Sequence, residues 1–122
     1  MKKRIATIAL VLTGSLSATA QTTDTMDRIE VCKQNYHTLF GGEALTGQGT
    51  DPEMMDILQK FIFGEVFQRG NLTLKQREMI TCITLATMQT LPQLKAHAGA
   101  ALNVGVTPEE LREVMYLTAP FI

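Results

Sequence analysis

Four helix-start signals divide most of this chain into short helices. Each is a threonine followed three residues later by Glu or Gln, a capping box in which the two side chains bond backbone N–H groups that the first helical turn leaves unpaired. Three of the four also carry proline in the first turn, where its missing N–H costs nothing. The signals occupy residues 50–53, 73–76, 90–93 and 107–110. They predict helices that begin near residues 50, 73, 90 and 107.

The spacing of apolar residues also favours helices. Apolar side chains recur at three- and four-residue steps, and we find no convincing strand pattern. The helical segments are about 25–39, 52–68, 74–89, 91–103 and 108–117. The third segment holds no charge between Met79 and Met88, so we expect it to form the buried centre. We therefore predict an all-α fold, a small helical bundle.

The first residues are typical of a targeting segment. Three basic residues precede the apolar run from Ile5 to Leu12, and Ala18-Thr19-Ala20 offers the small side chains that signal peptidase requires. The apolar run is too short to span a bilayer comfortably, although a retained anchor is the alternative. We therefore expect a signal peptide over residues 1–20, cleaved near Ala20, and a single periplasmic or secreted domain over residues 21–122 with no stable membrane span.

Composition and spacing disfavour several classes of function. Without residues 1–20, eight Lys and Arg stand against twelve Asp and Glu, and no basic stripe remains that would bind nucleic acid. Two histidines 60 positions apart and two cysteines 50 apart lack the close spacing of zinc ligands, so no metal site is predicted. The mature chain of 102 residues would bury only a modest core, which assembly would enlarge.

Three reactive side chains lie on the third and fourth predicted helices. Glu78 and Cys82 are four residues apart and share one helix face, while His97 lies at the border between core and surface of the next helix. A carboxyl group on the core side of a helix and an imidazole beside it are suited to proton transfer. Alternatively, Glu78 is a solvated carboxylate near the helix N-terminus, and His97 is structural or exposed.

The two cysteines, Cys32 and Cys82, leave three interpretations open. They are free and buried thiols, or a disulfide that closes a loop of about 50 residues, or reactive groups of a working site.

Several ordered motifs resemble one protein family. They are Phe63-Gly64-Glu65-Val66-Phe67, the segment from Leu72 to Arg77-Glu78, His97, and the run from Ala100-Ala101-Leu102-Asn103 to Val114. Over about residues 26–120 they resemble the carboxymuconolactone decarboxylase family, which includes the alkylhydroperoxidase-D-like proteins. The resemblance implies an all-helical subunit that assembles into homotrimers or homohexamers, with a small active site near the histidine helix and close to a subunit contact.

The resemblance also implies roles for individual residues. The lactone decarboxylases of the family release carbon dioxide from a small carboxylated substrate without a metal or organic cofactor, and His97 matches the family histidine. Glu78 matches the glutamate of the peroxidase-like branch by its distance from His97. That branch uses a Cys-x-x-Cys pair before the histidine, whereas Thr90 and Gln93 stand at those positions here. Family members usually continue into a final helix beyond the position of Ile122, which this sequence is expected to lack.

We therefore predict an exported, cofactor-free enzyme in which His97 and Glu78 move protons on a small carboxylated or lactone-like substrate, with Glu65 and Arg77 as substrate-binding groups. The first alternative is a thiol-based antioxidant in which Cys82, the third catalytic candidate, reduces a hydroperoxide or exchanges disulfides, with Cys32 as a resolving thiol. The second is a non-catalytic helical assembly protein.

Overall fold

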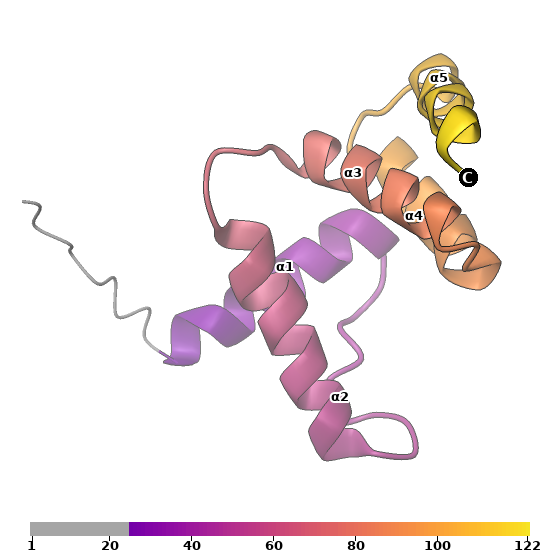
Figure 1. Cartoon of the computed structure of the whole chain (residues 1–122). Helices are drawn as coiled ribbons and strands as arrows, with labels where there is room; N and C mark the ends of the chain where they lie inside the picture. The colour runs from indigo at the N-terminus through magenta and orange to yellow at the C-terminus, as the bar shows by residue number, and fades with distance from the viewer. Residues whose placement is uncertain (1–24) are drawn as a thin grey trace, which may run out of the picture.

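The structure, a computed structural model, describes residues 25–122 (Figure 1). In this part of the chain five α-helices are joined by loops, and no strand occurs. The α-helices are α1 (Thr25–Phe40), α2 (Pro52–Gln59), α3 (Leu74–Thr87), α4 (Leu91–Asn103) and α5 (Pro108–Thr118). Three other helical segments are η1 (Lys60–Glu65), η2 (Val66–Gln68) and η3 (Ala119–Phe121). The predicted all-α fold is confirmed.

The predicted signal peptide, residues 1–20, lies outside the described residues. Cleavage near Ala20 and a domain that starts at residue 21 therefore stay predictions. Across residues 25–122, no helix combines the length and the hydropathy that crossing a membrane requires.

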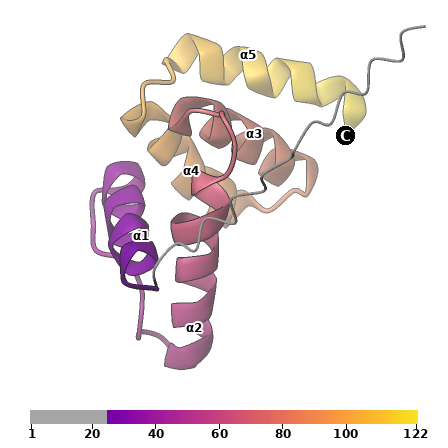
Figure 2. The same ribbon diagram turned by 90° about the vertical axis from the view of Figure 1, so that its left-hand side faces the viewer.

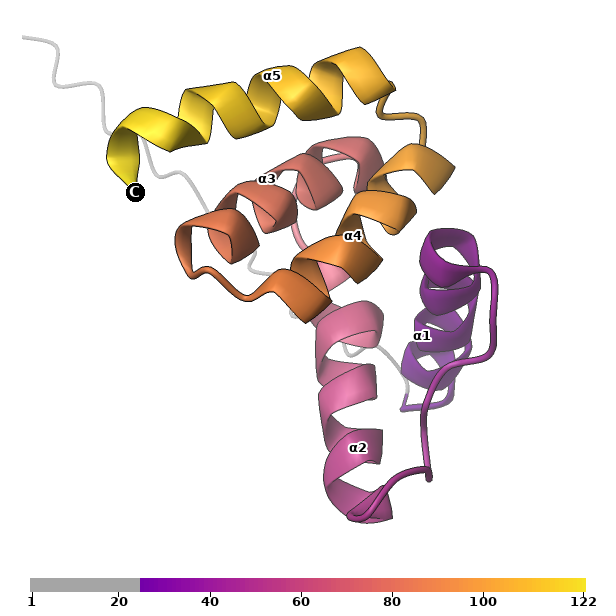
Figure 3. The same cartoon turned by 90° about the vertical axis from the view of Figure 1, so that its right-hand side faces the viewer.

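The helices are arranged around α4. Helix α3 packs beside α4, and α5 lies across the outer side of this pair (Figure 2). Helix α1 packs against both η1 and α4, so that α1 and the α2–η1 segment project from the opposite side (Figure 3). The two neighbouring residues Ala100 and Ala101 are both buried, yet they belong to different core clusters. Helix α4 therefore joins two small cores.

The prediction that the third helix forms the buried centre is wrong. On α3 the buried side chains are Glu78, Cys82 and Leu85, which all lie on one face. On the other side Ile80 is 49% exposed, and Ile83 is exposed as well. Helix α3 packs chiefly against α4 and α5, whereas α1 packs against η1 and α4. The small side chains of α4 suit it better to the central place, since they let other helices approach closely.

The second predicted helix is helical over residues 52–68, but it changes from α to π geometry at Lys60. Side chains of α1 bond the backbone of this segment. Cys32 Sγ donates to the carbonyl of Gln59 at 3.2 Å, and Asn35 Nδ2 donates to the carbonyl of Phe63 at 2.7 Å. These tertiary hydrogen bonds accompany the π-helical segment. The spacing of apolar residues along residues 52–68 cannot predict such a change of helix type.

Gly64 marks the closest approach between η1 and α1. A Cβ at this position would lie 2.5 Å from the carbonyl oxygen of Arg28, which is backbone and cannot move aside cheaply. We expect Gly64→Ala to destabilise the protein by about 1 to 3 kcal/mol or more through overpacking. The matched control is Gly99→Ala on α4, where nothing lies within 4 Å of the added Cβ.

In Gly99→Ala, the higher helix propensity of alanine should leave stability unchanged or raise it by up to about 1 kcal/mol. Urea unfolding followed by circular dichroism measures both variants. Equal stabilities of the two alanine variants would contradict the close approach.

The capping signals are confirmed at two helices and wrong in detail at the other two. Thr73 and Thr107 form complete capping boxes at α3 and α5. At α2 the cap is Asp51, whose carboxylate accepts from the backbone N–H of Met54, rather than Thr50. An aspartate is an equally good cap and stands next to Pro52, so the helix starts one residue later than the box predicts.

The fourth predicted cap, Thr90, has a different role. Its hydroxyl donates back to the carbonyl of Leu85, and its backbone N–H donates to the same carbonyl at 3.1 Å. Gln89, at φ 58°, donates to Ala86 and completes the six-residue turn that commonly ends a helix. Because this tight turn joins α3 directly to α4, the two helices run back along each other.

Candidate active site

Glu78 and His97 meet across the contact between α3 and α4. His97 Nδ1 lies 2.8 Å from Glu78 Oε2, although the two residues are 19 positions apart. Glu78 is in the second turn of α3 and His97 is in the middle of α4, so the turn at Gln89 folds them onto one another. The structure thus brings together the two residues that the sequence proposed as partners.

The environments of the two side chains differ. The Glu78 side chain is 0% exposed, whereas the His97 side chain is 20% exposed. The alternative in which Glu78 is a solvated carboxylate is therefore wrong. Within the described structure its second oxygen, Oε1, is buried without a hydrogen-bond partner. A buried carboxylate with a single partner depends strongly on that partner, because an uncompensated charge in the interior is very unfavourable.

The hydrogen bond to Glu78 assigns the two imidazole nitrogens of His97. With Glu78 as an ionised carboxylate, which only accepts hydrogen bonds, Nδ1 carries the hydrogen and donates to Oε2. Nε2 is then the nitrogen that exchanges a proton, as an acceptor in the neutral ring and as a donor in the imidazolium. The partly exposed imidazole, rather than the covered carboxylate, is the group of the pair that a substrate could reach.

Phe40 completes the surroundings of His97 and was missed by sequence reasoning. Its ring meets the imidazole edge to face, with centroids 5.3 Å apart and an interplanar angle of 82°. Phe40 is the last residue of α1 and lies 57 positions before His97. No spacing rule connects residues so distant in the chain.

Cys82 lies one turn after Glu78 on the buried face of α3 and is fully covered. Burial and, to a smaller extent, the neighbouring Glu78 carboxylate together raise the pKa of the Cys82 thiol to about 11. An activated nucleophile needs the opposite, a lowered thiol pKa. The structure therefore gives no support to the role of Cys82 as a peroxide-reducing group.

Cys32 is also fully buried, and both cysteines are free thiols. Cys32 belongs to the core cluster between α1, η1 and α4, while Cys82 belongs to the cluster between α3, α4 and α5. Burial raises the pKa of Cys32 above its ordinary value as well. Of the three interpretations of the cysteines, the structure shows the first, two buried free thiols.

The raised pKa of the Cys82 thiol predicts that the stability of the protein falls at alkaline pH. The Cys82 pKa is about 11 in the folded protein and near its ordinary value of 9.0 in the unfolded chain. The stabilisation by the neutral thiol is therefore complete below pH 9. It is lost as the pH rises through 11, because the unfolded chain loses the thiol proton first. The loss should amount to about 2 kcal/mol by pH 10.5, on the way to a full value of about 2 to 3 kcal/mol above pH 11.

Unfolding free energies of the wild type and Cys82→Ala at pH 7 to 10.5 measure this loss as the difference between their pH dependences. Identical dependences in both proteins would contradict it.

Glu65 and Arg77, the two predicted substrate-binding groups, have other partners. Glu65 forms an ion pair with Arg28 of α1. The Arg77 guanidinium donates to the backbone carbonyls of Val66, Arg69 and Leu72, and so holds the loop between η2 and α3. Neither side chain hydrogen-bonds to Glu78 or His97 in the part of the chain that the structure describes. Their role toward a substrate stays a prediction.

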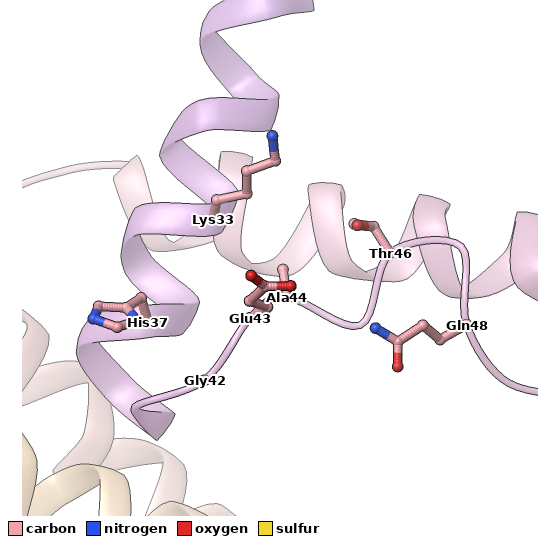
Figure 4. Close-up of a pocket in the computed structure, with 7 residues that line it drawn as sticks. All are labelled: Lys33, His37, Gly42, Glu43, Ala44, Thr46 and Gln48. Carbon is pink, nitrogen blue, oxygen red and sulfur yellow. The ribbon is translucent and has the colours of Figure 1, made fainter.

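A separate pocket lies between α1 and the loop that follows it (Figure 4). The pocket is lined by Lys33, His37, Gly42, Glu43, Ala44, Thr46 and Gln48. None of the predicted site residues lines it. The described residues contain no group of three or more His, Cys, Asp or Glu side chains that could hold a metal ion.

Two comparisons with known proteins found a match. The profile of the carboxymuconolactone decarboxylase family matches residues 52–122, which include α2 to α5 and both members of the Glu78–His97 pair. A protein named 4-carboxymuconolactone decarboxylase from Acinetobacter baylyi (strain ATCC 33305 / BD413 / ADP1) is 30% identical over 63 residues, which are 52% of this chain and 47% of that protein. The match thus spans about half the length of that relative. No solved structure matches this chain.

Proposed function

Because this chain belongs to the carboxymuconolactone decarboxylase family, we propose that it is a cofactor-free enzyme that removes carbon dioxide from a small carboxylated lactone. His97 is the group that transfers the proton, and Glu78 holds and polarises it. The observation that carries the proposal is the 2.8 Å contact between His97 Nδ1 and the fully buried Glu78 carboxylate, at the edge of the subunit interior.

The proposed reaction balances with one proton. The bond between the substrate carbon and its carboxylate breaks, carbon dioxide leaves, and the electron pair passes into the conjugated lactone carbonyl. The imidazolium Nε2–H then protonates a carbon of this intermediate, and the neutral ring recovers a proton from water. The Glu78 carboxylate accepts the hydrogen bond from Nδ1 and keeps Nε2 directed away from itself. Each turnover therefore consumes one proton and releases one carbon dioxide.

Turnover of 4-carboxymuconolactone, the compound in the name of the Acinetobacter relative, tests the proposal. We expect carbon dioxide release by the wild type and a fall in kcat/KM of about 10²- to 10⁴-fold in His97→Gln, which is the usual range for losing a general acid–base group. His37→Gln is the matched control, because His37 is the second histidine of the chain and is exposed on α1. Equal turnover in wild type and His97→Gln would refute the proposal.

The alternative thiol chemistry lacks a supporting observation. Cys82 is covered, its pKa is raised to about 11, and Thr90 and Gln93 replace the cysteine pair that the peroxidase-like branch carries before its histidine. Peroxide reduction by this protein would therefore need a thiol that is both exposed and acidic, which neither cysteine provides.

We also propose that the subunits assemble into a homotrimer or homohexamer. Large apolar side chains are exposed on successive helices, and apolar surface of this extent commonly marks a protein contact. Examples are Ile57, Phe61, Ile80, Leu91, Tyr116 and Leu117. Analytical ultracentrifugation should give three or six times the subunit mass, and a monomer at micromolar concentration would exclude this assembly.

Export to the periplasm or the medium is proposed from residues 1–20 alone. The mass of the protein recovered from its native host should correspond to a chain that begins near Gln21. An intact chain that retains Met1 and stays in the cytoplasm would contradict it.

A further inference from the structure

Helix α1 lies outside the region that the family profile matches, which begins at Pro52, yet its last turn contacts the candidate site. We infer that Phe40, at the end of α1, is a positioning residue that fixes the orientation of the His97 imidazole. The expected effect on kcat rests on the proposed function. The expected effect on the orientation of the His97 ring does not.

One hydrogen bond does not fix the imidazole plane. The contact between Nδ1 and Glu78 Oε2 limits rotation of the ring about the bond that joins it to its side chain, but a single hydrogen bond tolerates a range of angles. A change in that rotation would move Nε2, on the far side of the ring, away from its working position. A second contact on the ring is therefore needed for a defined Nε2 position.

Phe40 supplies this second contact. Its ring lies nearly perpendicular to the imidazole, at 82° with centroids 5.3 Å apart, which is a favoured geometry for two aromatic rings. Glu78 thus holds Nδ1 from α3 while Phe40 blocks rotation of the ring from α1. The imidazole is restrained by two elements that belong to opposite sides of α4.

Phe40 is itself held in place by two sets of contacts. Its ring packs against Tyr36 at 4.8 Å and against Phe63 at 5.8 Å between centroids, so a swing away from His97 would break an aromatic cluster. The backbone beside it is bonded to α4, because Asn103 Nδ2 donates to the carbonyl of Leu39 at 2.8 Å. Asn103 and His97 lie on the same helix, so this bond fixes α1 relative to the histidine.

The test replaces Phe40 by leucine, which keeps the volume apolar but removes the ring, and by tyrosine, which retains the ring. Phe121→Leu is the control, because Phe121 is a phenylalanine that is exposed in η3. Two readouts are recorded: ¹⁵N and ¹H NMR of the His97 ring, and kcat and KM for carbon dioxide release from 4-carboxymuconolactone.

We expect a sharp, hydrogen-bonded Nδ1–H signal in the wild type that broadens or splits in Phe40→Leu and returns in Phe40→Tyr. In the same variant kcat should fall by about tenfold to a hundredfold with KM nearly unchanged, because a small misplacement of a reacting group costs rate rather than binding. Phe121→Leu should match the wild type in both readouts.

An unchanged His97 signal in Phe40→Leu would overturn the inference, whatever happens to kcat. If the wild type releases no carbon dioxide, the proposed function fails, while the NMR comparison still decides the role of Phe40. If Phe40→Leu does not fold, Phe40→Met replaces it, and a ring signal in that variant equal to the wild type overturns the inference.

Discussion

Replacing His97 by alanine should cost the folded protein about 3 to 5 kcal/mol. Glu78 is fully buried, and Oε2 has its hydrogen bond from His97 while Oε1 has no partner in the described structure. Removal of the imidazole leaves a buried carboxylate that must take up a proton, admit water or unfold. The total stability of a domain of this size is roughly 5 to 15 kcal/mol, so the effect should be plain in urea unfolding.

A double variant shows whether the cost comes from the unpaired charge. Glu78→Leu combined with His97→Leu removes both polar groups at similar volume, and we expect a stability equal to the wild type or up to about 4 kcal/mol higher. The same variant should release no carbon dioxide. If the Glu78–His97 pair instead stabilises the fold, the double variant should be less stable than His97→Ala.

The second large effect concerns catalysis by Glu78. In Glu78→Gln the amide can donate to Nδ1, so the imidazole no longer needs its hydrogen there and the proton moves to Nε2. The neutral His97 ring then has no acceptor nitrogen that faces the substrate. The imidazolium form no longer has the Glu78 carboxylate as its partner. We expect kcat to fall by about 10²- to 10⁴-fold with KM nearly unchanged.

Steady-state kinetics on 4-carboxymuconolactone measures this effect. Glu113→Gln, an exposed position on α5, is the matched control and should retain wild-type turnover. A Glu78→Gln protein with normal kcat would show that the carboxylate does not assist the reaction.

Much of this fold could be predicted because the residues that start and end its helices lie close to one another in the sequence. The Thr73 and Thr107 boxes depend on side chains within a few residues of one another, and they form as predicted, although the boxes at Thr50 and Thr90 do not. The Glu78–His97 contact could be predicted for a related reason. Two helices joined by a short turn must pack side by side, and the face of each helix follows from its period.

The parts that could not be predicted depend on residues far apart in the sequence. The π-helical turn at η1 accompanies hydrogen bonds from Cys32 and Asn35 of α1, and Phe40 reaches His97 only because α1 packs on α4. The exposed side of α3 was misjudged because a helix that is apolar all round can be covered by its own subunit or by another one. Sequence periodicity does not distinguish the two.

In the proposed reaction, Nε2 of His97 is the atom that meets the substrate while Nδ1 stays with Glu78. ¹⁵N NMR of the labelled protein with a saturated carboxylated butyrolactone, which cannot pass its electron pair into a conjugated carbonyl, tests this directly. We predict that saturating ligand shifts the His97 Nε2 resonance and leaves Nδ1 nearly unchanged. A ligand that binds without changing Nε2, or that changes only the signals of His37, would contradict the assignment of the site.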